Sequence, residues 1–140
     1  MSSGVSDGKS PATGACRTCA ASQLISSFAD AMDRSDLDAI GAHFAEDAVF
    51  VMPTGDQWRG RDAIVAGFAQ ELQGSGTHVL VNHLIKVDGN TGTSSADILF
   101  TDVVDGAPKI MALAHYDDEL RWDGTRWQFI RKQVSVKGRA

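Results

Sequence analysis

Basic residues, cysteines and long apolar runs are scarce in this sequence, and their scarcity excludes several classes of protein. The 13 Lys and Arg are outnumbered by 18 Asp and Glu, so the chain has a formal charge of −5 and lacks the basic surface that phosphate binding requires. No apolar run approaches the roughly 20 residues that cross a bilayer, and the N-terminus lacks the charged region and apolar core of a signal peptide. We therefore predict a cytoplasmic protein with no nucleic-acid or membrane partner.

The two cysteines, Cys16 and Cys19, form the motif CRTC. They follow the segment MSSGVSDGKSPATGA, in which Ser, Gly and other small residues predominate, and we interpret residues 1–19 as a disordered leader. A CxxC pair can be a redox site, which needs a strand before it and a helix after it, or half of a zinc site, which needs two further ligands. Neither context is present, so we interpret the pair as two incidental thiols.

The remaining length fits one domain, residues 20–137, because 140 residues with 43% hydrophobic and 22% charged residues are ordinary for a globular protein with one core. The first half of this domain has helical spacing. Leu24, Phe28 and Met32 form an apolar stripe, and similar stripes follow. We predict helices at residues 20–33, 36–47 and 60–72, a short strand at 48–53 and a loop at 54–60.

The second half of the domain alternates with period two and predicts four long strands. They span residues 77–87, 93–104, 108–122 and 126–136, and Asp-Gly turns separate them. No Gly-rich phosphate loop follows a strand, so a nucleotide-binding α/β fold is not supported. Helices followed by strands indicate the α+β class, here a curved antiparallel sheet of four to five strands with helices packed on one face.

His83 lies halfway along an apolar row in the segment THVLVNHLIKVDG. With a period of two, that row consists of Val79, Val81, His83, Ile85 and Val87. Two interpretations are open: a core histidine satisfied by a backbone carbonyl, or a general base in a pocket.

His115 and Asp33 are the groups that could act with His83. His115 lies on a later strand whose two faces are both apolar, so alternation does not decide which face is inward. Asp33 ends the first helix and could overhang a pocket in the sheet, although a solvated capping aspartate is the alternative. A carboxylate would hold a buried histidine in one tautomer and raise its basicity, which suits proton transfer. No nucleophile elbow and no metal-ligand spacing is present, so we predict no metal and no cofactor.

Four segments carry a resemblance to a known family: FADAMDRSDLDAIGAHFAEDAVF, GRDAI, HVLVNHLIKVDG and YDDELRWDGTRWQFIRKQV. In this order they resemble the SnoaL-like branch of the nuclear transport factor 2-like (NTF2-like) superfamily. The resemblance implies a cone-shaped sheet wrapped around helices, with an interior pocket. The branch includes polyketide cyclases, ketosteroid isomerases and proteins without demonstrated activity.

Within the superfamily, the catalytic pattern most resembles that of scytalone dehydratase. The resemblance implies that Asp33 in AMDRSDL, His83 in NHLI and His115 in LAH are catalytic. The tyrosine that precedes that aspartate in the family is Met32 here, and the only tyrosine in the chain is Tyr116, so the water-polarising tyrosines are missing. That difference argues against scytalone itself as substrate, and against a ketosteroid isomerase site.

The related dehydrochlorinase has an arginine on its last strand that assists the leaving anion. Lys132 is at that position in WQFIRKQ, with Arg131 beside it. A cation there could stabilise an oxyanion or a leaving group, and the alternative is an exposed lysine at a strand edge.

These observations together predict a cofactor-independent lyase or isomerase. Its expected substrate is a small hydrophobic hydroxy-ketone, and cyclic and aromatic hydroxy-ketones are included in that class. The expected pocket residues are Phe50, Met52, Trp58, Phe68, Met111 and Tyr116. A non-catalytic binding protein and an association subunit with the same fold are the alternatives. Partly apolar outer strand faces also predict a homodimer or a higher homo-oligomer.

Overall fold

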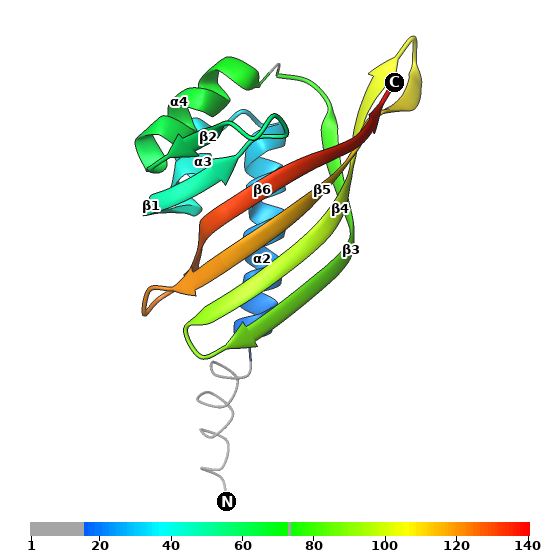
Figure 1. Ribbon diagram of the computed structural model, residues 1–140. Helices are drawn as coiled ribbons and strands as arrows, with labels where there is room; N and C mark the ends of the chain where they lie inside the picture. The colour runs from blue at the N-terminus through cyan, green and yellow to red at the C-terminus, as the bar shows by residue number, and fades with distance from the viewer. Residues whose placement is uncertain (1–15, 73) are drawn as a thin grey trace, which may run out of the picture.

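The computed structural model describes residues 16–72 and 74–140 (Figure 1). The helices are α2 (Arg17–Asp33), α3 (Leu37–Ala42) and α4 (Arg61–Glu71). The strands are β1 (Phe44–Val51), β2 (Gln57–Arg59), β3 (Thr77–Asp88), β4 (Thr91–Val104), β5 (Ala107–Trp122) and β6 (Trp127–Arg139). Most of the predicted leader, residues 1–15, lies outside the described residues, whereas Cys19 lies inside α2 and both cysteines are exposed free thiols.

The three helices form where helical spacing was predicted, with one difference. In α2 the stripe of Leu24, Phe28 and Met32 is buried. Asp36 caps α3, since its side chain accepts a hydrogen bond from the backbone N of Ala39 at 3.1 Å. The second helix was predicted to continue to residue 47, but it ends at Ala42, and Phe44 instead opens β1, where it pairs with Phe129 of β6. At Phe44, the stabilisation from pairing with a distant strand is larger than the helical preference of the local sequence.

The sheet has six strands in the order β2-β1-β6-β5-β4-β3, because the segment predicted as a loop contains the short strand β2. All neighbouring strands are antiparallel except β1 and β6, which are parallel. Figure 1 shows α2 running behind the long strands, on the inner face of the sheet, while α3, α4, β1 and β2 gather at one side. This arrangement is a curved sheet around N-terminal helices, as predicted.

Phe28 of α2 is the centre of the hydrophobic core. Its ring is fully buried and meets the rings of Phe44, Phe68 and Phe129 edge to face, with centroids 5.5, 5.9 and 5.4 Å away. Edge-to-face contacts between aromatic rings add about 0.5–1.5 kcal/mol to the stabilisation from area burial. The cluster therefore fixes α2 against β1 and β6.

A β-bulge in β3 interrupts the alternation of that strand. The register with β4 shifts between Val81 and Leu84, and Asn82 has a φ of 56°, in the left-handed region. Val79 and Val81, before the bulge, are 39% and 37% exposed, whereas Ile85, after it, packs against the core. The apolar row predicted with period two is therefore divided between the two faces of the sheet.

None of the helices in the described part of the chain has the length and apolar character that a membrane span requires.

Candidate functional site

A cavity of about 310 Å³ opens between α2, α4, the loop after β1 and the inner face of the sheet. Its walls are mostly apolar. Five of the six predicted pocket residues line it: Phe50, Met52, Trp58, Phe68 and Tyr116. The polar side chains of Asp33, Glu71, Ser75, His78 and Arg139 also reach it. A largely apolar cavity with few polar groups is the usual form of a small-molecule site.

Met111, the sixth predicted pocket residue, does not line the cavity. The register between β4 and β5 shifts where Met111 lies, since Phe100 pairs with Ala112 and Thr101 pairs with Ile110. Met111 is thus the unpaired residue of a second bulge, and Ala112 and Ala114 face the cavity instead. Alternation along β5 gives the same result once Tyr116 is known to face inward, because Met111 falls on the same side as Leu113 and His115.

Asp33 and His78 form the hydrogen-bonded pair of this cavity. Asp33 is the last residue of α2, and its Oδ1 lies 2.6 Å from Nδ1 of His78 on β3. Both carboxylate oxygens also accept from the backbone N of His78, at 3.0 and 3.2 Å. The carboxylate oxygen accepts the hydrogen bond that Nδ1–H donates, so in the neutral ring Nε2 carries the lone pair. The ring packs on Phe100, with centroids 4.9 Å apart.

The predicted contact between Asp33 and His83 is not formed. His83 lies after the bulge of β3, five positions along the strand from the histidine that Asp33 binds, and it does not line the cavity. Its Nε2 is buried without a hydrogen-bond partner among the described residues. Both the apolar row and the family resemblance favoured His83. Two features of the sequence could have favoured His78: its place at the start of the strand, and Asn82, a residue that tolerates positive φ.

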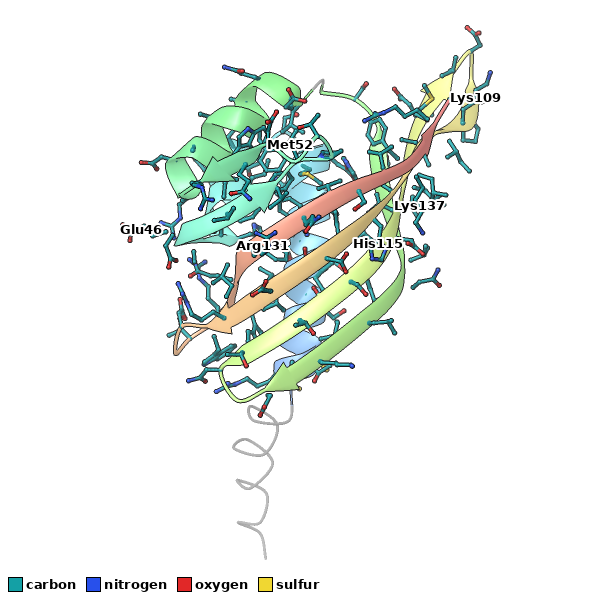
Figure 2. The ribbon with its side chains drawn as sticks, in the orientation of Figure 1. Glu46, Met52, Lys109, His115, Arg131 and Lys137 are labelled. Carbon is teal, nitrogen blue, oxygen red and sulfur yellow. The ribbon has the colours of Figure 1, made fainter. Side chains whose placement is uncertain are left out.

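His115 lies on the outer face of the sheet, away from the cavity, because its neighbours Ala114 and Tyr116 are the ones that face inward. Its Nδ1 is 2.8 Å from Oδ1 of Asp97, which also accepts from Lys137 Nζ at 3.0 Å. These contacts lower the pKa of Asp97 well below its usual value, with the hydrogen bond from His115 contributing most. Figure 2 shows His115 and Lys137 together on the sheet face opposite α2. His115 is therefore not positioned for the predicted catalytic role.

Lys132 is buried and is not at a strand edge. Its side chain has no exposed surface, and its Nζ donates to Oδ1 of Asp118 at 2.9 Å. Asp118 in turn accepts from Ser94 Oγ at 2.9 Å. The ammonium lies 3.9 Å from the ring centre of Tyr116 and 4.2 Å from that of Phe129. Burial lowers the pKa of Lys132, and the charge of Asp118 opposes that shift. Lys132 does not line the cavity, but it lies directly behind Tyr116.

Tyr116 connects the cavity to this buried ion pair. Burial first, and then the negative charges of Asp118 and Asp33, raise the pKa of Tyr116 well above its ordinary value. The phenol therefore keeps its proton at neutral pH and can act as a hydrogen-bond donor toward the cavity.

Among residues 16–72 and 74–140, no three His, Cys, Asp or Glu side chains are grouped to hold a metal ion.

Residues 17–133 match the family model of the SnoaL-like domain. The chain belongs to this SnoaL-like family. The match covers all of the helices and most of the sheet of the SnoaL-like domain, including both members of the Asp33–His78 pair. No protein of curated function matched the sequence significantly.

Several solved structures have the same fold as this chain. A protein of unknown function from Mycobacterium tuberculosis superposes with a TM-score of 0.80 at 19% identity, over 91% of this chain and 76% of that one. An NTF2-like protein with a cystatin-like fold from Novosphingobium aromaticivorans gives 0.77 at 18% identity, over 86% and 82%. A proposed dehydratase of the NTF2-like family from Streptomyces avermitilis gives 0.72 at 14% identity, over 86% and 96%. At these identities the similarity shows that the SnoaL-like domain has the NTF2-like fold.

Proposed function

We propose that this SnoaL-like domain is a cofactor-independent lyase or isomerase in which His78, held by Asp33, is the general base. The observation that carries the proposal is the 2.6 Å contact between Nδ1 of His78 and Oδ1 of Asp33 at the wall of an apolar cavity. A base must lie within hydrogen-bond reach of the proton that it removes. His78 meets that requirement for a molecule in the cavity, because its ring is part of the wall and its Nδ1 is already engaged.

The first step is removal of a proton from a carbon next to a carbonyl. Nε2 of His78 takes that proton, and the ring becomes an imidazolium whose positive charge is balanced by Asp33. The side chains of His78 and Asp33 are 18% and 21% exposed, so water screens this pair only in part.

The negative charge that develops on the substrate oxygen needs a donor, and Tyr116 is the candidate. Its raised pKa keeps the phenol protonated, and it lines the same cavity as His78. Lys132 Nζ lies behind the ring, 3.9 Å from its centre, where Asp118 balances its charge, so Tyr116 acts as a neutral donor. The proton on His78 then goes to a departing hydroxyl, which leaves as water, or returns to another carbon.

The walls define the substrate class. A cavity of about 310 Å³ with walls such as Phe50, Trp58 and Phe68 suits a small hydrophobic hydroxy-ketone of one or two rings. The similar structure described as a proposed dehydratase agrees with an elimination reaction. The fold by itself does not decide the chemistry.

A set of three variants tests this function. Cyclic β-hydroxy-ketones are screened for loss of water and for exchange of the α-proton in D2O. His78→Gln should lower the rate of an active compound by about 10²–10⁴-fold, the usual contribution of a general base. Asp33→Asn should lower it by at least about tenfold, because the ring loses the carboxylate that orients it. His83→Gln is the matched control, a histidine of the same strand outside the cavity, and it should keep the wild-type rate.

Two outcomes would contradict the proposal. If His78→Gln retained the wild-type rate, His78 would not be the base. If hydroxy-ketones bound in the cavity without exchange or elimination in any variant, the domain would be a small-molecule binding protein instead.

A further inference from the structure

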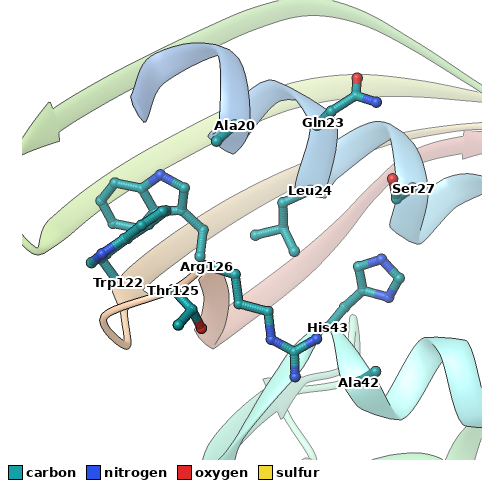
Figure 3. Close-up of a pocket in the computed structure, with 10 residues that line it drawn as sticks. Ala20, Gln23, Leu24, Ser27, Ala42, His43, Trp122, Thr125 and Arg126 are labelled. Atoms are coloured by element: carbon teal, nitrogen blue, oxygen red, sulfur yellow. The ribbon is translucent and has the colours of Figure 1, made fainter. Parts of the chain in front are cut away.

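A second cavity, of about 250 Å³, lies at the other end of α2 from Asp33. Its walls come from the N-terminal half of α2, the junction of α3 and β1, and the turn between β5 and β6 (Figure 3). None of its lining residues belongs to the cavity that contains the Asp33–His78 pair. It is therefore a separate site, and the proposed reaction does not use it.

Arg126 is the positively charged residue that lines this second cavity, and most N–H groups of its guanidinium have no close acidic partner among the described residues. Its only ion-pair contact among the described residues is 4.0 Å from Asp123, and its side chain is 56% exposed. Oδ1 of Asp123 is already engaged by the backbone N groups of Thr125 and Arg126. In Figure 3 the Arg126 side chain extends from the turn toward Ala42 and the ring of His43. A guanidinium at the wall of a cavity, with N–H groups that make no close ion pair, is suited to bind a carboxylate.

His43 supplies a hydrogen-bond acceptor beside that cation. Its Nδ1 contacts the carbonyl of Ala39, so Nδ1 holds the proton and Nε2 has the lone pair. Burial, and secondarily the charge of Arg126, lower the pKa of His43, and the ring is therefore neutral at pH 7. No hydrogen bond to Nε2 forms among the residues that the structure describes.

The rest of the lining combines apolar side chains with the polar side chains of Gln23, Ser27 and Thr125. Leu24 of α2 and the indoles of Trp122 and Trp127 line the cavity, with the two indoles 5.5 Å apart between ring centres. Arg17 covers Trp122 at 4.2 Å and donates to the carbonyl of Gly89, so this second cation is held outside the cavity. Walls of this kind accommodate one aromatic ring.

We propose that this second cavity binds a single-ring aromatic carboxylate, with the carboxylate on Arg126 and the ring against Leu24 and Trp122. A hydroxyl group on the ring donates to Nε2 of His43, so hydroxybenzoates bind more tightly than benzoate. The ligand class follows from one cation, one acceptor and the apolar side chains of a single small cavity, in which Gln23, Ser27 and Thr125 add only uncharged polar groups.

The test uses the full-length chain, NMR titration and four probes, namely benzoate and its 2-, 3- and 4-hydroxy derivatives. The chain has four histidines, so the ring signals of His43 and His78 distinguish the two cavities. Binding should move the His43 signals with a dissociation constant on the order of 1 mM for benzoate, as is usual for so small a ligand. At least one hydroxybenzoate should bind several-fold more tightly, and His43→Gln should abolish that preference.

Arg126→Gln should weaken the binding of every probe by at least about tenfold, since it removes a charge-assisted hydrogen bond. Arg121→Gln is the matched control, an exposed arginine of β5 that pairs with Asp47 at 2.9 Å and does not line the cavity. Benzyl alcohol, which has no charge, should not bind. The proposal is overturned if His43 signals do not move at about 10 mM benzoate, if the probes move only His78, or if Arg126→Gln binds them as the wild type does.

Discussion

Lys132 and Asp118 are the two charged side chains, among the described residues, that the fold removes from water. Their side chains are 0% and 2% exposed, and they meet at 2.9 Å. Breaking a buried ion pair on one side leaves an uncompensated charge, which is far more costly than removing both charges together.

Lys132→Met should therefore destabilise the domain by about 3–5 kcal/mol, because Asp118 stays buried without its partner. The double variant K132M/D118N should regain more than half of that loss, since the amide oxygen still accepts from Ser94. Urea unfolding followed by tryptophan fluorescence measures both values. The single variant Asp118→Asn completes the comparison. If the losses of the two single variants simply added up to the loss of the double variant, the two residues would not act as a pair.

His43 gives the stability of the domain a dependence on pH. Burial lowers its pKa from the ordinary value of 6.5, so below pH 6.5 the unfolded chain binds a proton that the folded domain resists. The contribution of His43 to the free energy of unfolding is fully present above pH 6.5, and it is lost as the pH falls toward the lowered pKa of the folded domain.

The expected result is that the wild type loses more stability than His43→Gln between pH 7.5 and pH 5.5, in urea unfolding at each pH. At pH 7.5 the ring of His43 is largely neutral in both the folded and the unfolded chain, so that pH is the reference for each protein. Parallel pH profiles in the two proteins would exclude His43 as the source.

At the scale of elements, the bulge in β3 turns both His78 and His83 toward the inner face of the sheet, and only His78 lies far enough along the strand toward Asp33 to line the cavity. It sets His78 before the irregularity and His83 after it, and Asn82 takes the backbone conformation that the bulge requires, with φ 56°. The side chain of Asn82 also donates to Asp97 at 3.1 Å.

Two substitutions at Asn82 separate the contribution of its side-chain hydrogen bond from that of its backbone conformation. Both Asn82→Gly and Asn82→Ala remove the hydrogen bond to Asp97, but only alanine has a Cβ that opposes positive φ. Asn82→Ala should therefore be less stable than Asn82→Gly by about 1 kcal/mol in urea unfolding. Equal stabilities would mean that the bulge relaxes to negative φ without penalty.

At the scale of the whole molecule, local patterns were enough to predict the order of every element except β2, and part of the cavity wall. The apolar spacing in α2 and the Asp-Gly turns both depend on neighbouring residues, and they were predicted correctly. Phe50, Trp58 and Phe68 were expected at a pocket and line one, although their role in substrate binding stays a prediction.

The errors came from positions where distant strands decide the outcome. Phe44 fits a helix locally and pairs with β6, and the end of α2 brings Asp33 to His78 and not to His83. The burial of Lys132 depends on Asp118, fourteen residues away on another strand, and no local pattern reports such a partner.

The oligomeric state also stays a prediction. Leu84, Val103 and Ile110 are 69%, 67% and 57% exposed on the single chain, which agrees with an apolar surface that a second copy could cover.

The position of Asp33 at the end of α2 has an electrostatic consequence. The backbone dipoles of a helix place a partial negative charge at its C-terminus, and the last turn of α2 contains no basic residue. Arg34, the next residue, is engaged by Asp30 and Asp36 at 2.9 Å each. The carboxylate and the end of the macrodipole thus both favour positive charge at the same place, the ring of His78. The last turn of α2 therefore acts together with Asp33, so a change that frays this turn should slow proton abstraction even with Asp33 and His78 intact.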